Sequence, residues 1–257
     1  MILIRIAEKV RYRLQAIPRY GAVIIFAALI FFFSVNRLSV GVGIGSYLES
    51  MNNVLPKTDR KVVAFTFDDG PHPGYSEKIL EILKEEGIKA TFFVVGEMAE
   101  KFPGLLRQEA EAGHEIGNHT YSDLRMTRVS EERALEEIEK TQKAIKRITG
   151  KSSRLLRPPG GHYNGVLVDI AEKKGYEVVL WSLNSNDITS PPAGEIYRNV
   201  ITRVKNEDVV IFHDGINSTI EALKSTIKRL KESGYGFVTV SELLSLKKER
   251  LNEDSWY

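Results

Sequence analysis

Five short polar segments in this chain carry side chains that together could hydrolyse an acyl group with the help of a metal ion. Each segment closes an apolar run of the kind that is typical of a strand. The side chains are two adjacent carboxylates, a histidine with a carboxylate four residues later, an arginine held by two prolines, a further carboxylate, and a second histidine. They are Asp68 and Asp69, His119 and Asp123, Arg157, Asp187, and His213.

Asp68 and Asp69 form the adjacent pair, directly after the apolar stretch 61–67. Neighbouring carboxylates repel each other unless a cation or hydrogen-bond donors offset the repulsion. A divalent metal would do so, with one Asp as its ligand and the other as a general base toward water. Taken alone, such a pair is also typical of a turn or a helix cap.

His119 and Asp123 are spaced so that one turn of helix would place both side chains on the same face. Imidazole and carboxylate are both ligands of zinc and similar ions. The pair is therefore a candidate for the rest of a metal site, although a lone histidine is more often structural. His114 is assigned to packing or hydrogen bonding, and His72 and His162 are left without a role.

The remaining side chains could supply the other roles of a hydrolase. Arg157 precedes two prolines, and a rigidly held guanidinium suits the binding of a carboxylate. Asp187 could pair with an arginine or a histidine, and His213, beside a carboxylate, could act as a general acid. Each could also be an ordinary salt-bridge member. Serine-hydrolase, P-loop and dinucleotide-binding motifs are absent from the sequence, so those functions lack support.

Strands and helices are expected to alternate along the body of the chain, which predicts a parallel sheet with helices outside. Because polar segments follow at least five different strands, an irregular (β/α) barrel of about seven parallel strands is favoured over an open sheet, with the polar residues at its mouth. Strands are predicted at 61–67, 90–95, 115–118, 155–157, 177–183, 208–212 and 237–240. Helices are predicted at 75–86, 98–112, 163–174, 194–205 and 219–233, from a cap at Ser130 to 148, and after a cap at Ser241.

The N-terminal segment differs from the rest in charge and hydropathy. Residues 1–20 carry five basic side chains against one acidic, a net +4, which leaves the remainder at −2 when the whole chain is +2. An uncharged apolar run then predicts a transmembrane signal anchor, with the N-terminus in the cytoplasm. A cleaved signal peptide and a buried core helix are the alternatives. The predicted parts are a cytoplasmic tail (1–20), an anchor (21–37), a linker (38–58), a catalytic domain (59–250) and a C-terminal tail (251–257).

Composition excludes several kinds of site. The chain has 257 residues, 42% of them hydrophobic, so the part after the anchor is long enough for one α/β domain. It contains no cysteine, which excludes disulfides, a cysteine nucleophile and zinc–thiolate sites. The excess of basic charge belongs to the N-terminal tail, so nucleic acid is not an expected partner.

The ordered set of segments resembles the polysaccharide deacetylases, the NodB-homology family also called carbohydrate esterase family 4, over about residues 61–246. In the first motif of that family, Asp68 stands at the catalytic base and Asp69 at a metal ligand. His119 stands at the first histidine ligand of the second motif. Arg157 is similar to the third-motif arginine, which orients the base, and Asp187 stands at the acidic residue of the fourth motif.

The same resemblance implies how substrate is bound. The backbone that follows Arg157, at Pro159 and Gly160, would help to bind the oxyanion. In the fifth motif Ile211 would line the acetyl pocket, and His213 would be the acid.

Three positions depart from the family pattern. Asp123 stands where the second histidine ligand is usual, because the eleven-residue spacing from His119 to Ser130 leaves no gap. The metal site would therefore be Asp69, His119 and Asp123, which is harder and more negative than Asp–His–His. Asp123 bound through a water, or as a plain loop or capping residue, is the alternative. Gly160 and Ile188 replace aromatic residues, which implies an atypical substrate cleft.

The resemblance implies a metal-dependent hydrolase that removes N-acetyl groups from amino sugars of a cell-envelope polysaccharide, first of all peptidoglycan, or chitin-like oligomers. One divalent ion would be needed, zinc by first expectation, with cobalt, nickel or manganese as alternatives. The partners would be an N-acetylated glycan and the membrane. We expect a monomer in the cell membrane with one span and its catalytic domain outside. An O-acetyl polysaccharide esterase and a catalytically impaired glycan-binding homologue are the rival functions.

Overall fold

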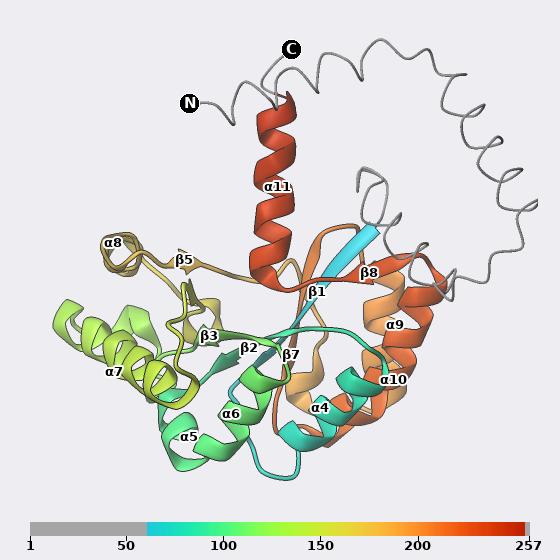
Figure 1. Cartoon of the computed structure of the whole chain (residues 1–257), viewed down its shortest axis with the longest axis horizontal. Coiled ribbons are helices and arrows are strands. Elements are labelled where there is room, and N and C mark those ends of the chain that lie inside the picture. The colour runs from blue at the N-terminus through green and yellow to red at the C-terminus, as the bar shows by residue number, and fades with distance from the viewer. Residues whose placement is uncertain (1–60, 255–257) are drawn as a thin grey trace, which may run out of the picture. The chain divides into compact units, whose positions relative to one another are not determined.

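The computed structural model describes residues 61–254, shown as coloured ribbon in Figure 1. The predicted cytoplasmic tail, anchor and linker lie outside these residues. Within the described part of the chain, no helix is both long and apolar enough to cross a bilayer.

Eight parallel strands form one sheet, built around the long first strand (Figure 1). The order is β5-β4-β3-β2-β1-β7-β6, and β8 pairs with the start of β1 while β2 pairs with its end. The predicted parallel α/β fold is confirmed, in the form of a half-barrel whose path has seven strands. The strands are β1 (Lys61–Asp68), β2 (Thr91–Val94), β3 (Glu115–Asn118), β4 (Leu155–Leu156), β5 (Glu177–Val178), β6 (Leu183–Asn184), β7 (Asp208–His213) and β8 (Tyr235–Phe237).

The prediction of a single strand at 177–183 was wrong. This stretch contributes to two short strands, β5 and β6, which lie at opposite ends of the sheet. The chain leaves β4 where Val179 N donates to Leu156 O, and it joins β7 where Ser182 N donates to Val209 O. Among the described residues, β5 and β6 are not paired with each other. The two ends of the half-barrel are therefore connected by the chain between these strands and not by strand hydrogen bonds.

The helices lie outside the sheet, except for α11, which leaves it (Figure 1). The helix predicted at 98–112 is broken at Phe102, because Pro103 cannot continue a helix from the preceding turn. The elements are α4 (Ser76–Glu85), α5 (Gly96–Lys101), α6 (Pro103–Glu111), α7 (Glu131–Thr149), α8 (Gly165–Lys174), α9 (Ala193–Arg203), α10 (Asn217–Glu232) and α11 (Val240–Asp254). The 3₁₀ turns are η2 (Met126–Arg128), η3 (Pro159–Gly161) and η4 (Asp187–Thr189).

Capping residues fix two helix starts. The predicted Ser130 cap of α7 is confirmed, because its hydroxyl accepts from Arg133 N at 3.3 Å. The Ser241 cap was wrong by two residues. Thr239 Oγ1 accepts from Glu242 N, and Glu242 Oε2 accepts from Thr239 N at 2.8 Å, so a capping box starts α11 at Val240. This helix ends at Asp254, four residues into the stretch predicted as a tail.

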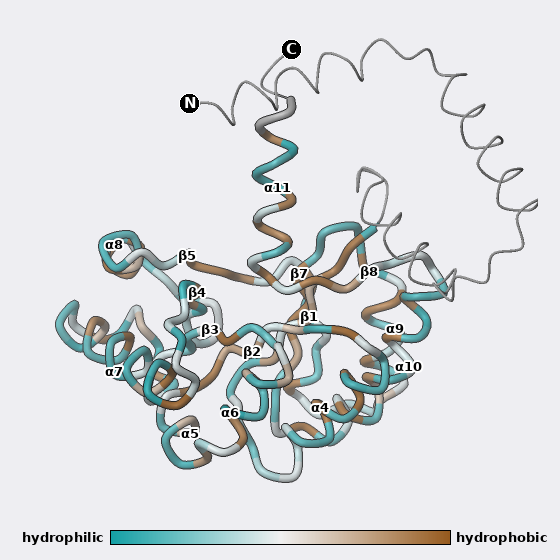
Figure 2. The backbone as a smooth tube through the Cα atoms, viewed as in Figure 1, coloured by the Kyte–Doolittle hydropathy of each residue, from teal (hydrophilic) through white to brown (hydrophobic). Residues whose placement is uncertain are grey.

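Alternation along β1 decides which side chains reach the inside of the half-barrel. Val63, Phe65 and Phe67 belong to the large core under the helices. Ala64 belongs instead to a smaller cluster that Val240 and Leu243 of α11 help to fill. Because side chains alternate along a strand, Thr66 and Asp68 share the inner side with Ala64. Figure 2 shows this hydrophobic sheet as the brown centre of the molecule.

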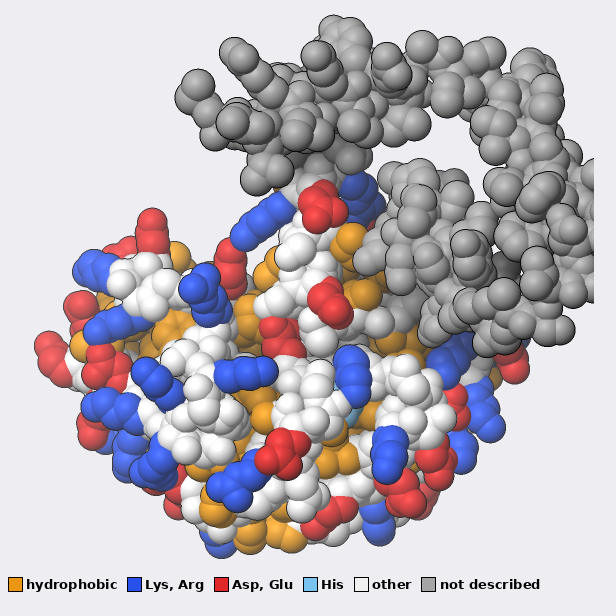
Figure 3. Space-filling view, in the orientation of Figure 1, with side chains coloured by type: hydrophobic (Ala, Val, Ile, Leu, Met, Phe, Trp, Pro, Cys, Tyr) orange, Lys and Arg blue, Asp and Glu red, His pale blue; other side chains and the backbone are white. Residues whose placement is uncertain are grey.

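Charged side chains of both signs are intermixed on the face shown in Figure 3.

Candidate active site

A buried ion pair joins the end of β1 to the end of β4. Arg157 Nη1 donates to Asp68 Oδ1 at 2.7 Å and to Thr66 Oγ1 at 2.8 Å. Both partners of the pair are buried, with 2% of Asp68 and none of Arg157 exposed. A charge-assisted hydrogen bond of this kind holds the Asp68 carboxylate in one orientation.

The Arg157 guanidinium is fixed on its other sides as well. Its Nε donates to Val179 O at 3.1 Å, and its Cζ lies 3.9 Å from the centroid of the Phe93 ring. Burial lowers the pKa of Arg157, and the charge of Asp68 works against that shift. Val179 lies in the segment that connects β5 to β6. This connection between the two ends of the half-barrel therefore helps to hold the arginine in place.

Asp69, His119 and Asp123 converge from two loops at the same mouth. His119 Nε2 lies 3.4 Å from Asp69 Oδ1 and 4.0 Å from Asp123 Oδ1, and one ligand atom from each residue lies within 4.8 Å of the others. His119 Nε2 is also 3.9 Å from Asp68 Oδ2. Two carboxylates and an imidazole are a donor set that suits a first-row divalent ion.

The helical turn expected between His119 and Asp123 was wrong. The segment is an irregular loop, with Thr120 at φ 67° and Asp123 at φ 52°. Positive φ is uncommon outside glycine and is strained for a β-branched residue. The four-residue spacing nevertheless returns Asp123 to His119, because the loop turns sharply instead of coiling.

The electrostatics of the three side chains also fit a cation. Burial alone would raise the pKa of Asp69, but the hydrogen bond and charge of His119, with the charges of His213 and His72, lower it on balance. Burial, followed by the charge of Asp69, raises the pKa of Asp123. The two carboxylates therefore compete for one imidazole, and a divalent ion would relieve their repulsion.

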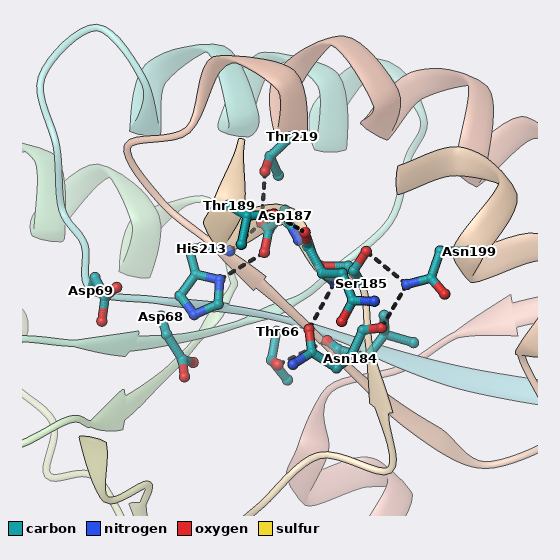
Figure 4. A network of polar contacts seen from close by, with 12 residues as sticks. Thr66, Asp68, Asp69, Asn184, Ser185, Asp187, Thr189, Asn199, His213 and Thr219 are labelled. Atoms are coloured by element: carbon teal, nitrogen blue, oxygen red, sulfur yellow. Dashed lines mark hydrogen bonds and ion pairs between the residues drawn. The ribbon is translucent and has the colours of Figure 1, made fainter. Parts of the chain in front are cut away.

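His213 and Asp187 form a second polar unit, from the end of β7 and from η4 (Figure 4). Asp187 Oδ1 accepts from His213 Nδ1 at 2.7 Å, and Oδ2 accepts from His213 N at 2.7 Å. The alternative arginine partner for Asp187 was wrong. Because the carboxylate faces Nδ1, that nitrogen carries the proton. Figure 4 shows the other ring nitrogen turned away from Asp187, on the side of Asp68.

Two side chains that support this unit could not be predicted from the sequence. Thr219, on α10, donates from Oγ1 to Asp187 Oδ2 at 2.6 Å. Asn199, on α9, donates from Nδ2 to Asn184 O at 2.9 Å and to Ser185 O at 2.8 Å, which ties down the loop before Asp187 (Figure 4). Both side chains come from the outer helices, and only the tertiary fold brings them to the strand ends.

The residues predicted to contact substrate differ in exposure. Gly160 is exposed in η3, next to buried Pro159. Its φ of 61° is a left-handed backbone conformation, which favours glycine. Ile211 is buried in β7, at 2% exposure, paired with Thr66 and Asn184.

His114, assigned to packing or hydrogen bonding, accepts from Ala90 N through Nδ1 at 3.2 Å, and burial lowers its pKa to about 4. His162 lies outside the metal trio and its ring Nδ1 is 3.4 Å from Arg125 Nη2.

Comparisons with known proteins define the class. The polysaccharide deacetylase family model matches residues 56–179. A peptidoglycan-N-acetylglucosamine deacetylase of Bacillus cereus is 39% identical over 194 residues, which are 74% of this chain and 91% of that protein. The chain therefore belongs to the polysaccharide deacetylases, carbohydrate esterase family 4, and is an enzyme of the class that hydrolyses N-acetyl amide bonds.

Two solved structures share the fold. The peptidoglycan deacetylase PdaC of Bacillus subtilis matches with a TM-score of 0.72 at 35% identity, over 76% of this chain and 96% of that structure. The curated PdaC sequence is longer, and the chain spans 42% of it. A pseudoenzyme of carbohydrate esterase family 4 from Bacillus anthracis matches with a TM-score of 0.70 at 30% identity, over 72% of this chain and 66% of that one.

Proposed function

We propose that this chain removes N-acetyl groups from amino sugars of peptidoglycan with a divalent metal ion held by Asp69, His119 and Asp123. The observation that carries the proposal is the convergence at one mouth of a carboxylate placed to act as base, a cluster of metal-ligand side chains and a histidine placed to act as acid. The names of the relatives from B. cereus and B. subtilis point to peptidoglycan as the polymer.

The metal would supply Lewis acidity, which polarises the acetyl carbonyl and makes water a better nucleophile. Zinc is our first assignment, and cobalt, nickel or manganese would also suit two carboxylates and one imidazole.

Asp68 is the proposed base. Its Oδ1 is occupied by Arg157, and its Oδ2 lies 3.9 Å from His119 Nε2, on the side of the metal cluster. The guanidinium holds the Asp68 carboxylate through one oxygen, which leaves Oδ2 to accept a proton from water. A backbone N–H near Gly160, at the end of the same rigid segment as Arg157, would donate to the developing oxyanion. Ile211 would line the space for the acetyl methyl group.

His213 is the proposed acid. Asp187 holds Nδ1, which leaves Nε2 to carry the proton that the leaving amine needs. Burial alone would lower the pKa of His213, but the hydrogen bond and charge of Asp187, with the charges of Asp68 and Asp69, raise it. The imidazolium is therefore retained to higher pH than in a free histidine.

Incubation of the full chain with purified peptidoglycan tests the substrate assignment. Muramidase digestion and mass spectrometry should then show disaccharides that have lost one acetyl group and gained a free amine. Acetate released without any free amine would instead identify an O-acetyl esterase. Activity on chitin-like oligomers with none on peptidoglycan would move the substrate but leave the reaction in place.

The rival from another class is a glycan-binding homologue without turnover. Two observations favour it: Asp123 departs from the usual histidine, and one structural relative at 30% identity is described as a pseudoenzyme. Against it, the Asp68–Arg157 pair and the His213–Asp187 pair are both assembled. Glycan binding with no release of acetate, in protein saturated with zinc, would establish the rival.

Replacing Asp123 by Ala is expected to weaken zinc binding by at least about tenfold, because one of three converging ligands is lost. Asp123→His should match or exceed the parent, since imidazole would complete an Asp–His–His set. Calorimetric titration of metal-free protein measures both. Parental affinity in Asp123→Ala would show that Asp123 is not a ligand, and His162→Ala would then be the next variant to titrate.

Replacing Asp187 by Asn should move the alkaline limb of the kcat profile to lower pH. The sign follows from the acid's need for its proton. Asp187 raises the pKa of His213, so activity in the parent is lost only above that raised pKa, and the variant loses its proton earlier. Profiles on N-acetylated oligomers provide the measurement. Identical alkaline limbs in the parent and the variant would show that deprotonation of His213 is not what ends activity at high pH.

The full chain should fractionate with membranes, whereas residues from about Leu38 onward should be soluble when produced alone. The reason is the basic tail followed by an uncharged apolar run at 21–35. Carbonate-washed membranes and the soluble fraction are compared by immunoblotting against the C-terminal domain. Intact full chain in the soluble fraction contradicts the anchor, and a shortened soluble product indicates a cleaved signal.

A further inference from the structure

The loop that carries Asp123 is anchored by a carboxylate from the second turn of α7, the next α-helix along the chain. Glu137 lies on α7 and only 1% of it is exposed. Its Oε2 accepts from Tyr121 N at 2.9 Å and from Ser122 N at 2.7 Å, and its Oε1 accepts from Ser122 Oγ at 3.1 Å. Arg133 Nη2 adds a fourth donor to Oε1 at 2.5 Å. One side chain therefore receives two successive backbone N–H groups of the loop.

These contacts fall between the two residues that bear metal-ligand atoms. Tyr121 and Ser122 directly precede Asp123 and follow His119 by two and three positions. The loop carbonyls are held from the other side, because Gly96 N donates to Thr120 O and Glu97 N donates to Tyr121 O. The backbone is thus fixed at both its N–H and its C=O groups.

Asp123 itself has no comparable support. Its side chain is 54% exposed, and within residues 61–254 it makes no hydrogen bond. The position of its carboxylate therefore depends on the loop backbone, which holds Thr120 and Asp123 at positive φ. Such a backbone conformation persists only where contacts with the surrounding structure hold it. Glu137 provides these contacts for the N–H groups of the loop.

We propose that Glu137 is a positioning residue for the metal site, which holds the Thr120–Asp123 turn so that the Asp123 carboxylate meets Asp69 and His119. The inference rests on the proposed function, in which Asp123 is a ligand. Partners that orient ligands commonly affect metal affinity by about ten- to a hundredfold. Glu137 acts on backbone N–H groups and does not itself reach the metal.

The test is a double-mutant cycle on metal affinity, with zinc titrated into metal-free full chain. Glu137→Gln keeps the shape, but its amide nitrogen cannot accept from the loop donors. We expect about tenfold weaker zinc binding in Glu137→Gln, and a further effect of less than about threefold when Asp123 is already Ala. Glu136→Gln is the matched control, because Glu136 accepts from Arg133 at 2.9 Å, is exposed and does not contact the loop. It should bind zinc as the parent does.

The possible outcomes distinguish the role of Glu137 from the proposed deacetylase function. Parental zinc affinity in Glu137→Gln overturns the inference, as does an equal loss in the parent and Asp123→Ala backgrounds. If Asp123→Ala alone leaves the affinity unchanged, the ligand assignment and the inference fall together, whereas deacetylase activity is scored separately. Should Glu137→Gln not fold, Ser122→Ala removes one of the three loop contacts. A loss of about threefold supports the inference, and parental affinity overturns it.

Discussion

Replacing Asp68 by Asn is expected to reduce turnover by about 10²- to 10⁴-fold while zinc remains bound. Asn keeps the size of the side chain and an oxygen that can accept from Arg157, but it cannot take a proton from water. Asp68 lies outside the trio of Asp69, His119 and Asp123, so metal affinity should change little. Steady-state rates on N-acetylglucosamine oligomers and zinc titration measure the two effects separately.

Asp69→Asn is the matched control for that prediction. It alters the neighbouring carboxylate and should lower zinc affinity as well as turnover. Thermal unfolding of both variants shows whether they are folded, because Asp68→Asn removes the counter-charge of the buried Arg157. Near-normal activity of Asp68→Asn would reject Asp68 as the base.

Replacing His213 by Ala should also reduce turnover of N-acetylated substrate, by about 10²- to 10⁴-fold. The amine cannot leave readily without a proton, and His213 Nε2 is the proposed donor, held in place by Asp187 at 2.7 Å. Removing only the Thr219 hydroxyl, as in Thr219→Val, should have a smaller effect, because Asp187 would still accept from the ring Nδ1 and from the backbone N of His213. Rates at saturating substrate give the comparison.

Two outcomes would contradict these assignments of His213 and Thr219. If His213→Ala and the parent turn over at similar rates across the pH range, another group protonates the amine. If Thr219→Val is as inactive as His213→Ala, the Asp187 carboxylate is positioned mainly by α10 and not by the histidine.

The fold could be predicted where the local pattern was unambiguous. β1 alternates between outward Phe65 and Phe67 and inward Thr66, and its end fixed where Asp68 would lie. The stretch 177–183 could not be resolved in this way. Apart from Glu177 and Ser182 it is apolar, and nothing local shows that its two halves pair with β4 and β7 at opposite ends of the sheet.

The candidate site shows the same division. The order of polar segments after strands placed Asp69, His119 and His213 at one mouth, because parallel strands end on the same side. The partner of Asp187 was a choice between arginine and histidine that only packing settled. Thr219 and Glu137 lie on helices 32 and 15 to 16 residues away from the atoms that they hold. No sequence spacing marks such contacts.

The most direct test of the account is the parallel release of acetate and free amine from an N-acetylglucosamine oligomer by the full chain. We expect equal amounts of the two products, their loss when zinc is removed with a chelator, and their return when zinc is added back. Oligomer that binds to the zinc-loaded protein but yields neither product would contradict it.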